Sequence, residues 1–326
     1  MGKKLIQISF LFVFATLLVV IGHADITLDY KDIWIFKWVY SFHMPLFFFL
    51  SGFLFAYTHP EDKMRKINFF SFMKKKVRRL LLPFLFINSV IFVIKSRFVS
   101  AELMQHPLTF SFPSWVESML ERPIGFMWFL PALFMIFVFF SLIKRGIYIN
   151  IYLQIGGVIL LFLLSNVMPD VSFMQLSLAV HYSVYFSLGI IYCIHKKKVD
   201  AFLLRYKYTI LLGAFMLSAC LIPVRVIAAL AGVVFCLVLS LVVESHCGDR
   251  IVCLSDYTYT VFLLSYFPQM FIRGPIAHAL PEVNQYVLSV VSVVVGFILP
   301  IALGLFYRKV LDKNSVTRFV GLLIGI

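Results

Sequence analysis

Long apolar runs recur along the whole chain, and they are continuous rather than alternating between apolar and polar residues. Most are about 17 to 25 residues long, the length that a helix needs to cross a bilayer, whereas a membrane β-barrel shows short alternating segments. We therefore predict an all-α, polytopic integral membrane protein. The ten predicted transmembrane helices are Leu5–Ile21, Trp34–Tyr57, Leu80–Ile94, Phe126–Ile143, Ile151–Val167, Gln175–Ile194, Tyr208–Ile222, Val226–Val243, Tyr257–Ile272 and Tyr286–Phe306.

The composition supports the membrane setting. Hydrophobic residues make up 62% of the 326 residues and charged residues only 13%, which is too little polar surface to cover a soluble globule of this size. The chain has no linker, low-complexity tract or detectable internal repeat. We interpret residues 1–326 as a single transmembrane domain in contact with membrane lipid.

The distribution of Lys and Arg predicts the orientation. If both termini are cytoplasmic, 22 of the 29 Lys and Arg residues lie in the inner segments. This agrees with the positive-inside rule and predicts a multi-pass protein of a bacterial-type cytoplasmic (inner) membrane. The net charge of +14 is then explained by short loops that set topology and meet anionic lipid, and no nucleic-acid partner is predicted.

The five cysteines include no CxxC pair. We interpret them as small packing residues or free thiols, and we predict neither a disulfide nor a metal site. The oligomeric state is left open by the sequence.

His43 stands well inside the second predicted span, about 14 Å from its outer end at the rise of a helix. A polar group in hydrocarbon is costly unless it has a partner, so an intramembrane histidine is a candidate functional residue. Pro45 lacks an N–H and predicts a kink beside it, and Ser51-Gly52 predicts close approach of another helix. The alternative interpretation is a histidine that donates to a carbonyl of a neighbouring helix.

His23 lies at the outer end of the first span, two residues before Asp25. In a loop, Asp25 would be able to hold the imidazole and fix its tautomer, as an acyl-transfer base requires, although an ordinary exposed carboxylate is the alternative. For His181, in the outer half of the sixth span, a structural role is favoured. The first run also resembles a secretory signal whose cleavage after Ala24 would remove His23, but its length favours a retained span.

Several segments in order resemble the membrane-bound acyltransferase-3 family. They are VVIGHA from Val19, YSFHMPLFFFLSGFLF from Tyr40, FFSFMKKKVRRLLLPFLF from Phe69, MWFLPALF from Met127 and YFSLGIIY from Tyr185. No GxSxG, Walker or HExxH motif offers a rival chemistry. The resemblance covers most of the chain, and it implies ten spans.

The resemblance implies an O-acyltransferase. An acyl group, acetyl or sometimes succinyl, would pass from cytoplasmic acyl-CoA to a hydroxyl of a sugar or polysaccharide on the outer side, without a metal. It implies His23 as general base, His43 as a second active-site histidine, and a donor-side role for Arg79. Lys76 and Arg78 lie in the same basic segment and would meet the donor's phosphates, although setting topology is the alternative role of that segment. Trp128 would line the substrate cavity, to which we also assign Asp25, Ser51 and His181 as candidates.

Two positions depart from the family pattern. Phe12 stands where many relatives carry an Arg eleven residues before the first histidine, and Ser265 replaces a histidine common near the ninth span. Two other functions therefore stay open: a carrier or exporter of a polysaccharide or lipid-linked substrate, and a non-catalytic subunit of an envelope complex. A carrier is disfavoured because no pair of broken helices is apparent in the sequence.

Overall fold

The computed structural model describes residues 5–24, 33–59, 68–99, 108–143, 150–244, 249–280, 282–311 and 313–326, and within these ranges the regular structure is entirely helical. The all-α fold class is confirmed. The longer helices are α1 (Ile6–His23), α2 (Trp34–Thr58), α5 (Leu82–Phe98), α7 (Phe129–Leu142), α9 (Ile151–Val167), α10 (Leu176–Arg205), α11 (Lys207–Cys220), α12 (Arg225–Val243) and α17 (Gln285–Phe306).

Seven continuous helical segments of the described chain are long and apolar enough to cross a membrane. They are Ile6–His23, Trp34–Thr58, Phe69–Phe98, Gly125–Leu142, Phe173–Arg205, Arg225–Val243 and Gln285–Leu311. Helices α9 and α11 are apolar and lie where two further spans were predicted, but they are shorter than these seven segments. The protein is therefore a multi-pass helical membrane protein, whereas the number of ten spans and the cytoplasmic termini stay predictions.

The ninth predicted span is not one continuous helix. It is divided into α14 (Thr258–Leu264) and α15 (Tyr266–Phe271), which contains Pro268, and a π-helical segment, η6 (Ile272–Ile276), which contains Pro275, begins at its last residue. Proline cannot donate the helical hydrogen bond, and its ring forces the preceding turn to widen. The break brings polar side chains of α15 and η6 beside the end of α1.

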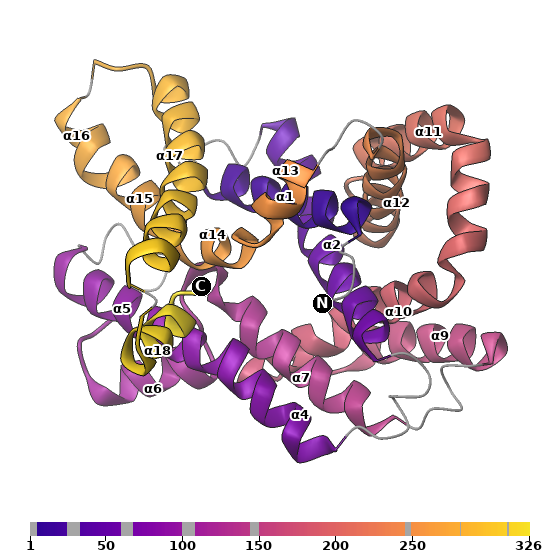
Figure 1. Ribbon diagram of the computed structural model, residues 1–326, viewed down its shortest axis with the longest axis horizontal. Coiled ribbons are helices and arrows are strands. Elements are labelled where there is room, and N and C mark those ends of the chain that lie inside the picture. The colour runs from indigo at the N-terminus through magenta and orange to yellow at the C-terminus, as the bar shows by residue number, and fades with distance from the viewer. Residues whose placement is uncertain are drawn as a thin grey trace.

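Helix α2 occupies the centre of the molecule (Figure 1), where it packs against α1, α10 and α12. The contact with α10 is very close, because a Cβ built on Gly52 would lie 1.9 Å from the backbone oxygen of Phe186. Gly189 makes the reciprocal approach to the backbone oxygen of Phe49, also at 1.9 Å. The close approach predicted from Ser51-Gly52 is confirmed, and it holds His43 on a rigid element.

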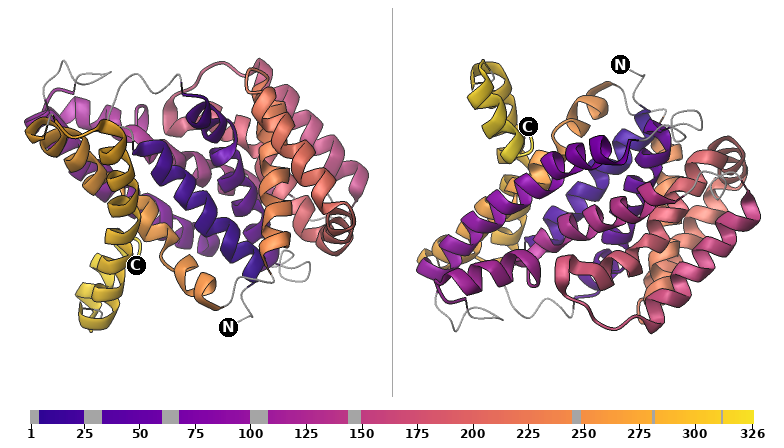
Figure 2. Two further views of the ribbon diagram at one scale, coloured as in Figure 1. Left: turned by 90° about the horizontal axis from the view of Figure 1, so that it is seen from above. Right: turned by 90° about the horizontal axis from the view of Figure 1, so that it is seen from below.

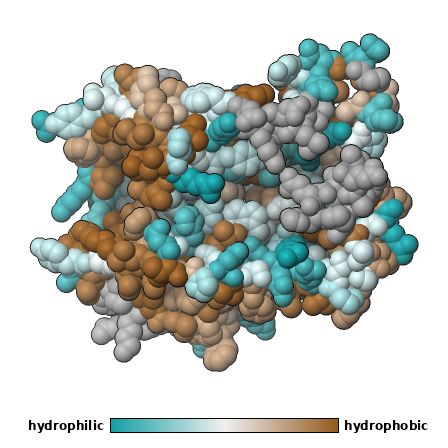
Figure 3. All heavy atoms as spheres, turned by 180° about the vertical axis from the view of Figure 1, so that it is seen from behind, coloured by the Kyte–Doolittle hydropathy of each residue, from teal (hydrophilic) through white to brown (hydrophobic). Residues whose placement is uncertain are grey.

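The remaining helices form two flanking groups. Helices α9 to α12 lie on one side of α1 and α2, and α14 to α17 lie on the other (Figures 1 and 2). Five shorter helices of the described chain complete the arrangement: α4 (Phe69–Lys76), α6 (Phe112–Leu120), α13 (Asp249–Ser255), α16 (Ala277–Ala279) and α18 (Ser315–Leu323). Hydrophobic side chains cover broad areas of the surface in Figure 3, as expected for lipid contact.

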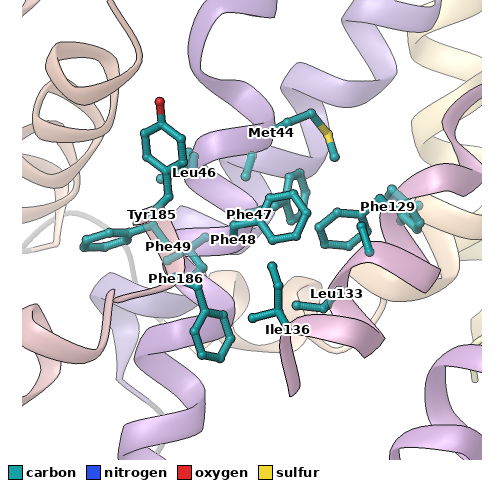
Figure 4. Packing of buried hydrophobic residues seen from close by; sticks show 14 of the residues in the cluster. Met44, Leu46, Phe47, Phe48, Phe49, Phe129, Leu133, Ile136, Tyr185 and Phe186 are labelled. Carbon is teal, nitrogen blue, oxygen red and sulfur yellow. The ribbon is translucent and has the colours of Figure 1, made fainter. Parts of the chain in front are cut away.

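Aromatic residues dominate the core. Five phenylalanines are almost wholly buried, namely Phe42, Phe48, Phe53, Phe84 and Phe186. Figure 4 shows Phe47 of α2 beside Phe129 of α7, with Leu133 and Ile136 next to them. Such rings pack at angles to one another and form much of the contact between α2, α7 and α10.

Candidate active site

We use inner end and outer end for the two ends of the bundle that the distribution of Lys and Arg predicts to face the cytoplasm and the opposite side. His23 is the last residue of α1, at the outer end. The last carbonyls of a helix lack helical partners, and here other groups satisfy them. The Val20 carbonyl accepts from Nε2 of Gln269 at 2.8 Å, and the Gly22 carbonyl accepts from the Tyr40 hydroxyl at 2.6 Å. These bonds fix the end of α1 and with it the half-buried His23.

His43 lies one turn after Val39 on α2 and is only 4% exposed. Its Nδ1 lies 2.9 Å from the Val39 carbonyl oxygen, which accepts a hydrogen bond, so Nδ1 carries the proton and Nε2 is the acceptor in the neutral ring. The Tyr40 ring meets the imidazole edge-on at 5.0 Å between centroids. Tyr40 therefore connects His43 with the end of α1.

Tyr40 lies beside both histidines, because its hydroxyl donates to the carbonyl of Gly22, next to His23, while its ring packs on His43. The two histidines are close enough for their charges to interact, and Arg273 of η6 is also within such reach of His23. The His23 ring packs on Phe126 at 5.6 Å, and none of the described residues hydrogen-bonds to that ring. An unpaired imidazole held beside a second one is suited to accept a proton from a substrate hydroxyl.

A cavity of about 630 Å³ opens in the inner half of the bundle. Its wall carries the cations Lys76, Arg79 and Arg308 together with Ser51, and α1 contributes Phe12 and Thr16. Lys76 Nζ lies 3.6 Å from the centroid of the Phe137 ring, while the Tyr259 hydroxyl donates to the Arg79 carbonyl at 2.7 Å. The wall carries one carboxylate as well, that of Asp256, so the cavity combines an apolar interior with an excess of positive charge that fits an anionic ligand with an apolar end.

An aromatic layer closes the cavity towards the outer end. Phe47, Phe129 and Phe262 line the cavity, and each pair of these rings lies in contact, with centroids 5.8, 5.4 and 6.2 Å apart. Beyond the layer, Phe126 contacts Phe262 at 5.3 Å and His23 on its other side. The histidines are therefore not among the residues that line the cavity, and one layer of rings separates them from it.

The other residues predicted for the site are dispersed. Arg78 is exposed and is not part of the cavity wall. Trp128 is half-buried in an aromatic group with Phe48 and Tyr182, at 6.3 and 5.4 Å, and it lies outside the wall. His181 is exposed, with its ring against Tyr182. Asp25 lies outside the described residues.

Some residues of the arrangement were not found from the sequence. Arg308 was counted only as a topological charge, yet it lies on the cavity wall, with its guanidinium 4.5 Å from the Tyr257 ring. Tyr40, Gln269 and Arg273 were also missed. Their signal was weak: each is a polar residue inside an apolar run, and only the tertiary fold brings them to the end of α1.

The two departures from the family pattern occupy different places. Phe12 is half-buried on the cavity wall, so the first helix contributes no cation there. Arg308 supplies a cation to the same cavity from the end of α17. Ser265 is 2% exposed and lies at the junction of α14 and α15.

These features define a multi-pass helical membrane protein with a basic inner cavity, a histidine at the end of its first helix and a second, buried histidine inside its second helix. Residues 8–306 match the family model described as the acyltransferase domain of the acyltransferase-3 type, and the chain belongs to this family. The predicted resemblance is confirmed, and membership supports acyltransferase activity. No curated protein and no solved structure gives a significant match to the chain.

Proposed function

We propose that the protein is a membrane O-acyltransferase that moves an acyl group, acetyl or succinyl, from cytoplasmic acyl-CoA to a hydroxyl of a sugar or polysaccharide on the outer side. The observation that carries this proposal is that His23 at the end of α1 and His43 inside α2 both lie beside Tyr40, beyond the aromatic layer that closes a cavity with basic walls. Family membership supports the reaction class. The excess of basic residues at the inner end supports the orientation.

Acyl-CoA would bind from the inner end. Its phosphates carry several negative charges, and Lys76, Arg79 and Arg308 provide cations on the wall of a cavity of about 630 Å³. Guanidinium groups suit phosphate because two N–H donors meet two oxygens. The pantetheine arm and acyl group would then follow the apolar lining, past Thr16 and Phe47, towards the histidines.

The aromatic layer has a direct consequence for this route. Phe47, Phe129 and Phe262 stand between the cavity and Phe126, which contacts His23. The acyl group reaches the histidines only if these rings move apart when the donor binds. A layer that opens on binding also keeps water from the thioester when no donor is present.

The reaction itself requires one proton transfer to the enzyme. Neutral His23 takes the proton of the acceptor hydroxyl while the hydroxyl oxygen forms a bond to the acyl carbonyl carbon. The carbon–sulfur bond then breaks, the coenzyme A thiolate leaves, and the imidazolium returns the proton to it. The hydrogen bond from His43 Nδ1 to the Val39 carbonyl keeps this ring in one tautomer, with Nε2 as the free acceptor of the second active-site histidine.

Mass spectrometry of surface and periplasmic glycans tests the proposal. Cells that express the protein are compared with cells that lack it and with cells that carry His23→Ala at equal membrane abundance. We expect the mass of one acyl group per modified sugar in the first cells and its absence in the other two. Unchanged modification in the His23→Ala cells overturns the catalytic assignment. A loss of the whole glycan from the surface, without a change in its mass, would instead identify a carrier.

A further inference from the structure

A second group of charged and aromatic side chains lies at the outer end, outside the chemistry described so far. Lys95 is in the last turn of α5, Tyr266 begins α15, and Arg273 belongs to η6. The Lys95 Nζ lies 5.6 Å from the centroid of the Tyr266 ring, and the Arg273 guanidinium carbon lies 5.4 Å from the same centroid. Two cations therefore meet on one aromatic ring.

This pair of cations has no counter-ion in the described part of the chain. The ion pairs found there join Arg122 to Glu117 and Lys196 to Asp200. The side chain of Arg273 donates from Nε to the backbone oxygen of Gln269 at 3.3 Å and forms no ion pair. Both side chains are half-buried, and a cation that is partly removed from water is stabilised by a nearby anion.

The pair is connected to His23 through direct contacts. The Tyr266 ring packs on Phe126 at 5.5 Å, and Phe126 packs on the His23 ring. Arg273 is close enough to His23 for their charges to interact. An anion held by Arg273 would therefore lie within a short molecule's length of the proposed base.

Gln269 fixes this geometry and leaves a further polar atom open. Its Nε2 holds the Val20 carbonyl on α1, and its backbone oxygen accepts from Arg273. Gln269 is fully buried, yet its Oε1 has no hydrogen-bond partner. A Cβ on Gly296 of α17 would lie 2.8 Å from the Gln269 side chain, so α17 confines it. Buried side-chain acceptors in folded proteins nearly always have a partner, so this atom is left for a donor outside the described chain, a water molecule or a ligand.

We propose that Lys95 and Arg273 bind the acidic group, a carboxylate or phosphate, of the acceptor, while His23 takes the proton of its hydroxyl. The acceptor is then an acidic sugar rather than a neutral one. This inference rests on the proposed acyl transfer, because it assigns the acceptor subsite of the same site. The guanidinium of Arg273 supplies the directional contact, and Lys95 supplies a second charge.

Binding of two matched probes tests the subsite without acyl transfer. The full-length protein in nanodiscs of phosphatidylcholine is titrated with p-nitrophenyl β-glucuronide and with p-nitrophenyl β-glucoside, which differ by the carboxylate. We expect the glucuronide to bind about tenfold more tightly, since one charge-assisted contact contributes roughly 1.5 kcal/mol. Lys95→Gln and Arg273→Gln should each reduce that preference, and the double variant should abolish it.

Controls distinguish this subsite from the rest of the account. Arg97→Gln, two residues after Lys95, changes an exposed guanidinium that stacks on Phe110 at 3.8 Å, and the preference should persist. His23→Ala should abolish transfer and keep the preference, so that failure of catalysis and failure of the subsite give different results. Because Lys95 lies in the last turn of α5, we expect Lys95→Gln to fold. This variant alone still tests the subsite if Arg273→Gln does not fold.

Three results would overturn the inference. The first is equal or absent binding of the two probes by the wild-type protein. The second is a preference for the glucuronide that survives the double substitution. The third comes from nanodiscs that also contain phosphatidylglycerol. If native mass spectrometry finds this lipid retained by the wild type and lost from the double variant, with no glucuronide preference, the cations bind a lipid headgroup and not the acceptor.

Discussion

The inner and outer halves of the bundle differ in how open they are and in the charge that they carry. The inner half is open and positively charged, with a cavity of about 630 Å³ whose wall carries Lys76, Arg79 and Arg308. The outer half is closed around His23 and His43, which are held by aromatic rings and by hydrogen bonds to helix carbonyls. In the proposed function, donor binding and proton transfer would therefore take place on opposite sides of one aromatic layer.

The largest effect should follow from removing the base in the outer half. His23→Ala should lower kcat by about 10³-fold, since general-base catalysis contributes about 10² to 10⁴. His278→Ala is the matched control, because His278 is also near the outer end but is exposed on α16. Acyl transfer by purified protein in nanodiscs measures both. Equal losses of kcat in His23→Ala and His278→Ala would contradict a specific role of His23 as the base.

The scaffold that joins the halves gives the next effect. Gly189→Leu places a side chain where a Cβ would already be 1.9 Å from the Phe49 backbone oxygen, so α2 and α10 must separate. We expect destabilisation of about 1–3 kcal/mol or more, as for overpacked cores. Gly213→Leu on α11, with open space around its Cβ position, should unfold at the wild-type temperature. Thermal unfolding in detergent provides the comparison, and similar midpoints for both variants would contradict it.

Substitutions on the wall of the inner cavity should weaken donor binding and leave the chemical step unchanged. Arg308→Ala and Arg79→Ala should each raise KM for acyl-CoA about tenfold with kcat nearly unchanged, because the contact to phosphate is made equally before and during reaction. Lys309→Ala removes an exposed neighbouring charge that is not on the cavity wall. Its KM should stay at the wild-type value. A fall in kcat for Arg308→Ala, with KM constant, would show that Arg308 acts in the chemical step and not in donor binding.

The smallest effect concerns the layer between the halves. Phe47→Leu keeps much of the volume but removes a ring that contacts Phe129 and Phe262. We expect faster hydrolysis of acyl-CoA in the absence of an acceptor, because water reaches the thioester more easily. Phe139→Leu, an exposed position on α7, should leave hydrolysis unchanged. Release of free coenzyme A thiol reports the rate, and no difference between the variants would show that the layer does not exclude water.

Much of the fold could be predicted because membrane helices follow length and hydropathy. Ile151–Val167 was predicted with the bounds of α9, and the small residues of α2 indicated its close contact with α10. The break between α14 and η6 was not predicted, since Tyr257–Ile272 is as apolar as a continuous span. Pro268, three residues after the break at Ser265, was the signal inside that range, and Pro275 lies just beyond it.

The candidate site was only partly predictable. His23 and His43 stand out as ionisable residues in apolar runs, and the structure brings them together. Arg308 and Arg273 lie more than 200 residues from His23 along the chain, so their places depend on how α15 and α17 pack against α1. No local pattern encodes that packing. The same reason explains why the aromatic layer was not anticipated, since its rings come from three helices.

The account depends most directly on a single path from the inner cavity to the outer histidines. Cryo-electron microscopy of the protein in nanodiscs with a non-hydrolysable thioether analogue of acetyl-CoA would reveal that path. We expect the phosphates beside Lys76, Arg79 and Arg308, the rings of Phe47 and Phe129 moved apart, and the acyl carbonyl next to His23. An analogue that stops on the inner side of an unchanged aromatic layer, or that binds away from this cavity, would contradict the account.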